Sequence, residues 1–271
     1  MTMLKLAAVA VAASIGAAPA LAADLSPAAP PAYKALPVAT YDWTGFYVGA
    51  HGGWGRLDSA DGIVAADAPS AAILTSLGVP SSLPLGTSGA VAGGQLGYNR
   101  QFGRWWLAGI ETDLSWTDLA STATAASPVQ PDRIYTANAK LDWFGTLRGR
   151  IGMLPSERLL LYATGGLAYG HAQLSTNLIR VNGAANICII PPAGANNCQA
   201  GSTSALIPGW TIGGGAEWMF ARGWSVKAEY LYYDLGTLSH AMTDANFPSV
   251  FNASADVKGS IVRAGINFKF D

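Results

Sequence analysis

Charged residues recur at every second position in segments that are otherwise strongly apolar. In residues 140–153 (KLDWFGTLRGRIGM), Lys140, Asp142, Arg148 and Arg150 stand at even positions among leucine, tryptophan, isoleucine and methionine. Side chains at period two share one face of a β-strand, so these charges would meet charges from neighbouring strands. The chemistry that such a pattern favours is an ion-pair network.

The same period in the other apolar segments predicts one shared polar face. Its charged members are Glu111, Asp113, Asp142, Glu217 and Glu229, with Lys140, Arg148, Arg150, Lys227, Arg263 and Lys269. Five acidic groups against six basic groups nearly balance. Balance is what a shielded interior requires, because a buried charge is costly unless it is paired and hydrogen-bonded.

Other reactive residues form no comparable pattern. The histidines His51, His171 and His240 are scattered, whereas a hydrolytic site would need a Ser or Asp beside one of them. We expect local hydrogen-bonding or interfacial histidines, no catalysis and no cofactor or metal. The run 213–215 is all glycine, but no Gly-Lys-Ser/Thr follows it, which argues against a phosphate-binding loop.

The overall composition limits the class of protein. Half of the 271 residues are apolar and 12% are charged, about half the charged fraction of a typical soluble domain. The formal net charge of -1 gives no indication of a nucleic-acid partner.

The first 42 residues have the features of an exported protein's N-terminal region. Residues 1–22 combine Lys5, a short apolar stretch and an Ala-Leu-Ala site at 20–22, and they predict a secretory signal peptide with cleavage after Ala22 or Ala23. A retained membrane anchor is the alternative. Residues 23–42 are rich in Ala and Pro and predict an extended periplasmic linker.

The rest of the chain, residues 43–271, divides into eight segments of strand character. They are 43–56, 88–102, 105–117, 137–153, 158–174, 209–220, 224–236 and 257–270. Tight turns at 103–104, 154–157 and 221–223 alternate with long connections at 57–87, 118–136, 175–207 and 237–256. This alternation is typical of an outer-membrane barrel with short periplasmic turns and long outer loops. We therefore predict an all-β fold, an eight-stranded antiparallel transmembrane barrel with four extracellular loops and periplasmic termini.

The two faces of these strands then have separate roles. The apolar face, with aromatic residues towards its ends, would meet lipid, and the charged face would meet the interior. Eight strands leave an interior that side chains can fill. From the expected heights we predict inward contacts Glu111–Arg148, Glu217–Lys227 and Glu229–Arg263, with Arg150 joining the network.

Three features fall in the long connections. Secretion makes a disulfide between Cys188 and Cys198 plausible, and two free thiols are the alternative. Residues 70–77 could form a short helix. The sequon at 252–254 indicates a polar loop.

Several stretches resemble a known family. They include WTGFYVGAHGGWG, DWFGTLRGRIGM, WSVKAEYLYYDLG and VRAGINFKF, and together such pieces span residues 43–270. The chain resembles the small outer-membrane β-barrels of alphaproteobacteria, the porin-family or outer-membrane immunogenic proteins related to the opacity proteins. The resemblance implies a cell outer membrane location and assembly by the barrel-insertion machinery. Its terminal signal matches Arg263, Gly265, Phe268 and Phe270, although Asp271 follows the final aromatic.

The functional hypotheses follow from this resemblance and from the interior. The first is a structural and surface-exposed protein with outer-membrane lipid and lipopolysaccharide as its surroundings. The second is a narrow porin-like channel, which a packed eight-stranded interior disfavours. Binding of a haem-like ligand or of a host surface by the loops is a further alternative, and an enzyme is the least favoured.

Overall fold

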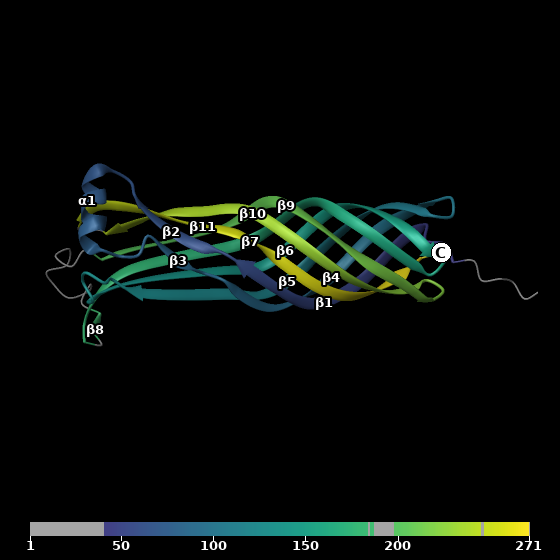
Figure 1. The fold of residues 1–271 in the computed structure, drawn as a ribbon, viewed down its shortest axis with the longest axis horizontal. Coiled ribbons are helices and arrows are strands. Elements are labelled where there is room, and N and C mark those ends of the chain that lie inside the picture. Colours follow the sequence, from purple (N-terminus) through teal and green to yellow (C-terminus); the bar gives the residue numbers. More distant parts are fainter. Residues whose placement is uncertain (1–40, 184, 187–197, 245–246, 271) are drawn as a thin grey trace, which may run out of the picture. The chain divides into compact units, whose positions relative to one another are not determined.

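The computed structural model describes residues 41–183, 185–186, 198–244 and 247–270 (Figure 1). Eight long strands form a closed antiparallel ring: β1 (Gly45–Asp58), β4 (Thr87–Phe102), β5 (Trp106–Ala126), β6 (Arg133–Ser156), β7 (Leu159–Asn182), β9 (Gln199–Ala221), β10 (Trp224–Asp244) and β11 (Phe247–Lys269). Each pairs with the next, and β11 pairs with β1, so the ring has no open edge. The predicted eight-stranded barrel is confirmed. The predicted signal peptide lies outside the described residues, as does most of the linker.

One end of the barrel, here named the turn end, carries the short connections. β4 and β5 are joined through Gly103, and β9 and β10 through Gly223, both in the left-handed region with φ of 61° and 76°. Glycine has no steric cost at such angles, which allows a tight hairpin. Figure 1 shows the C-terminal end of β11 at this same end.

The opposite end, here named the loop end, carries the predicted long connections, but much of their length is β-strand. The strands continue far into the connections, so β6 and β7 each have 24 residues and only residues 127–132 separate β5 from β6. The predicted disulfide involves Cys188, which lies outside the described residues, and it stays a prediction.

The connection between β1 and β4 holds a small subdomain at the loop end. β2 (Ala60–Ala65) pairs with β11 and with β3 (Ser82–Pro84), and the helix α1 (Ala68–Leu77) lies between them in the sequence. The Asp67 side chain accepts a hydrogen bond from the Ser70 backbone N–H at 2.7 Å, and Gly78 ends the helix with φ of 59°. The short helix expected at 70–77 is present. Among the described residues, no helix is long and apolar enough to cross a bilayer. A further short strand, β8 (Ala185–Asn186), pairs with the end of β7.

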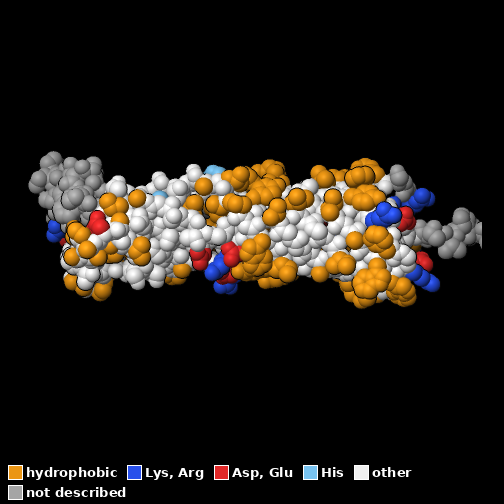
Figure 2. All heavy atoms as spheres, turned by 90° about the horizontal axis from the view of Figure 1, so that it is seen from above, with side chains coloured by type: hydrophobic (Ala, Val, Ile, Leu, Met, Phe, Trp, Pro, Cys, Tyr) orange, Lys and Arg blue, Asp and Glu red, His pale blue; other side chains and the backbone are white. Residues whose placement is uncertain are grey.

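Two girdles of aromatic residues encircle the exterior of the ring. The turn-end girdle includes Phe46, Trp106, Trp218 and Trp224, and the second includes Trp54, Trp116, Trp210 and Tyr232. Ten residues separate the two along β5, which corresponds to about 25 Å for a strand tilted by ~40°. Figure 2 shows hydrophobic side chains gathered near the turn end and again near the middle of the barrel. The spacing fits the apolar band of an outer-membrane barrel.

The barrel reverses its polarity beyond the second girdle. Between the girdles the exterior is apolar and the interior is charged, whereas towards the loop end the interior is apolar and the exterior polar. On β6 a bulge produces the change: the register with β7 shifts between Leu141 and Trp143. One extra residue exchanges the faces of a strand, so Phe144 and Leu141 both point inward and are fully buried.

Candidate functional site: a charge cluster inside the barrel

Eight charged side chains meet in the barrel interior between the two girdles. The cluster comprises the carboxylates Glu111, Asp113, Glu217 and Glu229 and the cations Arg148, Arg150, Lys227 and Arg263, all of which are buried. Four negative and four positive groups leave the cluster without net charge. Opposite charges in this proportion allow each desolvated ion to find a partner.

Arg148 lies at the centre of the cluster and joins three strands. Its guanidinium donates to Glu111 at 2.5 Å and to Asp113 at 3.0 Å on β5, and to Glu229 at 3.0 Å on β10. The Nε–H donates to the hydroxyl of Thr146 at 2.9 Å. Because the planar guanidinium offers five donors, one Arg can hold several carboxylates at fixed positions.

A second arginine, on the last strand, also binds two carboxylates of the cluster. Arg263 on β11 donates to Asp113 at 2.9 Å and to Glu229 at 2.6 Å. Lys227 on β10 reaches across the lumen to Glu111, with its ammonium 2.9 Å and 3.0 Å from the two carboxylate oxygens. Strands that are not neighbours in the sheet are thus bound directly through the interior.

The part of the cluster nearest the turn end is organised by Arg150. Its guanidinium lies 3.1 Å from Glu217 and donates to the Asn99 side chain at 2.7 Å. The rings of Tyr47 and Tyr162 lie on it at 4.8 Å and 5.3 Å from the guanidinium carbon. These aromatic faces stabilise the buried cation, and Glu111 lies near it as a second carboxylate at 3.7 Å.

Uncharged polar groups surround the ions and hydrogen-bond to several of them. His51 on β1 bonds to Gln95 on β4 and Ser115 on β5, both at 2.8 Å. Asn267 donates to Glu217 at 2.7 Å and accepts from Gln95. With Thr164 on β7 donating to the Gly149 carbonyl and lying 3.5 Å from Arg148, every strand of the ring contributes to the cluster.

The structure brings most of the predicted inward residues together, in partly different pairs. Glu111 meets Arg148 and Glu229 meets Arg263, as we predicted from the sequence. Lys227 is the register neighbour of Glu217 on β9, but its ammonium bonds to Glu111 instead. Glu217 pairs with Arg150. The predicted Glu217–Lys227 contact is therefore wrong.

Asp142 and Lys140 do not belong to the interior. They form an ion pair with 2.5 Å between Lys140 Nζ and Asp142 Oδ1 on the exterior, where the Lys140 side chain is 52% exposed. Asp142 also lies 2.8 Å from His171 Nδ1. The prediction that both face inward is wrong because the bulge at Asp142 interrupts the alternation on which it was based.

The residues of the assembly signal lie on both faces of β11. Arg263 belongs to the cluster, and Gly265 faces inward in register with His51. Phe268 and Phe270 point outward, with their ring centroids 5.3 Å apart, and Phe268 also contacts Trp224 at 4.9 Å. Lys269 donates to the Thr44 carbonyl at 3.1 Å, below the cluster. Asp271 lies outside the described residues.

Apolar groups close the interior on both sides of the charges. At the turn end, Trp43 is buried and donates its indole N–H to the Glu157 carbonyl at 3.0 Å; it packs with Leu107, Leu154, Leu160 and Met219. At the loop end a larger apolar core includes Leu119, Tyr135, Leu141, Leu174 and Phe251. The same period-two alternation indicates inward positions for His51 and Asn267. Trp43 precedes the first strand, and no pattern indicated that it plugs the lumen.

Comparison with known proteins gives the same assignment as the fold. Residues 8–270 match the family model described as outer membrane protein beta-barrel domain. The chain is 34% identical over 258 residues to the 31 kDa outer-membrane immunogenic protein of Brucella melitensis biotype 1, which covers 95% of this chain and 96% of the relative. The protein of the same name from Brucella suis biovar 1 matches equally.

Among solved structures, the outer membrane protein OprG from Pseudomonas aeruginosa superposes with a TM-score of 0.53. The two share 13% sequence identity, and the match covers 85% of this chain and 98% of that one. At this identity the likeness concerns the fold alone. The girdles, the charged interior, the family match and the Brucella relatives agree, and this chain belongs to the outer-membrane β-barrel family and is a protein of the cell outer membrane.

Proposed function

We propose that this outer-membrane protein is a structural and surface-exposed barrel that contributes to envelope integrity and surface interactions, without catalysis. The observation that carries the proposal is the cluster itself. Together with the uncharged polar groups around it, the charge-balanced cluster links all eight strands through the interior and fills the lumen at its height. A rigid, closed barrel with long strands projecting from the membrane suits a mechanical and surface role.

The filled lumen argues against a diffusion pore. A solute would have to pass the apolar group around Trp43, then the ion pairs, then the larger apolar core at the loop end. The cavity beside Trp43 and Glu217 has a volume of only about 10 Å³, roughly what one water needs. Open channels occur in barrels with many more strands.

The arrangement that comes nearest to a catalytic one is the Asp142–His171 pair on the exterior. Asp142 is already engaged by Lys140 and by Gln173, whose amide donates at 2.6 Å. His171 stacks on Trp143 with ring centroids 6.5 Å apart. Among the described residues no hydroxyl is hydrogen-bonded to this imidazole, so the pair lacks the nucleophile that a hydrolytic triad needs. A role in fixing the bulge accounts for it.

The proposed partners follow from the exterior. The apolar band between the girdles would be surrounded by outer-membrane lipid and, in the outer leaflet, by lipopolysaccharide. The barrel-assembly machinery would act on β11 during biogenesis, through the terminal aromatic signal. The name of the Brucella relatives, an immunogenic protein, supports exposure of the loop end to the outside.

Deletion of the gene separates the structural function from a pore. We expect the deletion strain to take up more of a hydrophobic fluorescent dye, because the envelope is weakened, while hydrolysis of a hydrophilic β-lactam by periplasmic β-lactamase in intact cells does not slow. Complementation with the wild-type chain should restore the dye barrier. Slower β-lactam hydrolysis with unchanged dye uptake would show that the barrel conducts solutes.

A further inference from the structure

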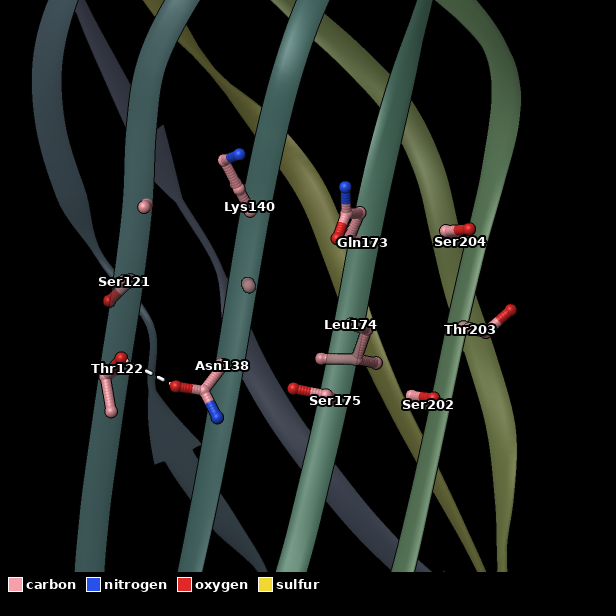
Figure 3. A pocket seen from close by; sticks show the side chains of 12 residues that line it. Ser121, Thr122, Asn138, Lys140, Gln173, Leu174, Ser175, Ser202, Thr203 and Ser204 are labelled. Carbon is pink, nitrogen blue, oxygen red and sulfur yellow. Dashed lines mark hydrogen bonds between the residues drawn. The ribbon is translucent and has the colours of Figure 1, made fainter.

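The exterior of the projecting strands carries a hollow that the proposed function does not use. It lies over β5, β6, β7 and β9, has a volume of about 460 Å³ and is open to the surroundings (Figure 3). We name it the polar trough. It is lined by Ala120, Ser121, Thr122, Asn138, Ala139, Lys140, Gln173, Leu174, Ser175, Ser202, Thr203 and Ser204.

Outward hydroxyl and amide groups in the trough stand in rows across the sheet. Thr122 is opposite Asn138, Asn138 opposite Ser175, and Ser175 opposite Ser202. A second row holds Lys140, Gln173 and Ser204 in register. Figure 3 shows both rows on four adjacent strands. Neighbouring strands are ~4.8 Å apart and outward residues along a strand ~6.7 Å, so the sheet presents a fixed lattice of donors and acceptors.

The trough begins directly above the second girdle. Lys140 is three residues from Trp143, which is the register partner of the girdle residue Trp116. Groups at this height are the first that stand outside the hydrocarbon band. A ligand in the trough would therefore lie among the sugars of the outer-leaflet glycolipid.

The charges of the trough limit the ligand further. Among the described residues that line the trough, Lys140 is the only charged one, and Asp142 neutralises part of that charge at 2.5 Å. A polyanion would need several cations, and an acyl chain would leave the hydroxyls without partners. Sugars fit, because hydroxyl and amide side chains can both donate to and accept from sugar hydroxyls, and Lys140 would meet a single phosphate or carboxylate.

We propose that the polar trough binds the core sugars of lipopolysaccharide molecules that surround the barrel. The site gives the proposed envelope function a defined lateral contact: glycolipids beside β5 to β9 are held by their sugars as well as by their acyl chains. The inference rests on the proposed surface location. The test of this proposal measures binding by the purified protein. Its failure can therefore be distinguished from a failure of the proposed function, which is tested by permeability in cells.

The experiment uses the full chain folded into phospholipid nanodiscs that contain no lipopolysaccharide. Core oligosaccharide, freed of lipid A by mild acid hydrolysis, is titrated by calorimetry. The test variant is Ser175→Leu with Ser202→Leu, which fills the trough. The matched control is Ser239→Leu with Ser254→Leu, an in-register outward pair on β10 and β11 with similar exposure.

We expect saturable binding by the wild type and by the control, and at least about tenfold weaker binding by the test variant, since two hydroxyl partners are lost. Lys140→Gln should weaken binding of phosphorylated core while leaving dephosphorylated core unaffected, and it serves as the second variant if the double leucine change prevents folding. No binding by the wild type, equal loss in test and control variants, or equal competition by core-free lipid A would overturn the proposal.

Discussion

Arg148 provides the sharpest test of the interior cluster, because a matched ion pair exists on the exterior of the same strand. The Arg148–Glu111 and Lys140–Asp142 pairs both have a nitrogen–oxygen distance of 2.5 Å. Their surroundings differ: the Arg148 side chain has no exposed surface, whereas that of Lys140 is 52% exposed. Comparing Arg148→Ala with Lys140→Ala therefore shows the effect of burial on an ion pair, because the nitrogen–oxygen distance is the same in both pairs.

The expected loss of stability on Arg148→Ala follows from the ion pairs that remain in the cluster. Glu111 keeps Lys227 at 2.9 Å, and Asp113 and Glu229 keep Arg263 at 2.9 Å and 2.6 Å. Three cations then face four carboxylates, so one buried negative charge has no counterpart. Breaking a buried pair in this way lowers the free energy of unfolding by about 3–5 kcal/mol. Lys140→Ala should lower it by less than about 1 kcal/mol, because water screens an exposed pair.

The assay is urea unfolding of the barrel in lipid vesicles, followed by the fluorescence of its nine tryptophans. A double-mutant cycle with Glu111→Ala completes it. We expect the double variant to lose less stability than the sum of the two single variants, by about 1–3 kcal/mol, since removing both partners restores the charge balance. Additive losses, or equal costs for Arg148→Ala and Lys140→Ala, would refute the view that the interior is dry and coupled.

Three further predictions concern glycine packing, pH and orientation. A Cβ at Gly53 would lie 2.1 Å from a backbone carbonyl of β11, whereas one at Gly52 meets only an atom at 3.9 Å; Gly53→Ala should destabilise the barrel by about 1–3 kcal/mol and Gly52→Ala by less than about 0.5 kcal/mol in the same urea assay. Burial raises the pKa of Asp61 on β2. The paired strands β2 and β3 therefore gain stability at acidic pH, and this gain is lost as the pH rises through the raised pKa. Hydrogen-exchange protection of these strands, corrected for intrinsic rates, should show this dependence, and Asp61→Asn should abolish it. Proteinase K added to intact cells should cut within 57–87 or 175–207 and spare the turn at 221–223, and cleavage at that turn would invert the orientation.

The period-two alternation predicted the faces of most strands but failed on β6 at Lys140 and Asp142. It placed Glu111, Glu229 and Arg263 inward, where the structure has them. At Asp142 a bulge inserts a residue, and the faces exchange beyond it. Nothing in the local sequence marks the bulge, because it depends on how β6 pairs with both of its neighbours, β5 and β7.

Contacts across the lumen were harder to predict than contacts between neighbours. Matching the positions of inward residues along adjacent strands correctly predicted the contact between Glu229 and Arg263. Lys227, however, extends to Glu111 on a strand that is not its neighbour. In a narrow barrel a long flexible side chain can reach the opposite wall, and sequence spacing contains no information on that distance. The strand extensions at the loop end were not predicted, because their many Ala, Ser and Thr residues give only a weak alternation of apolar and polar positions.

The measurement that most directly tests the central claim, a barrel closed by its buried charge cluster, is single-channel recording in planar lipid bilayers. The wild-type protein, shown to be folded and inserted, should produce no current steps above the bilayer background. We expect this because, among the described residues, the lumen holds buried ion pairs between two apolar groups. Reproducible, stable conductance steps from the folded wild-type chain would contradict the account.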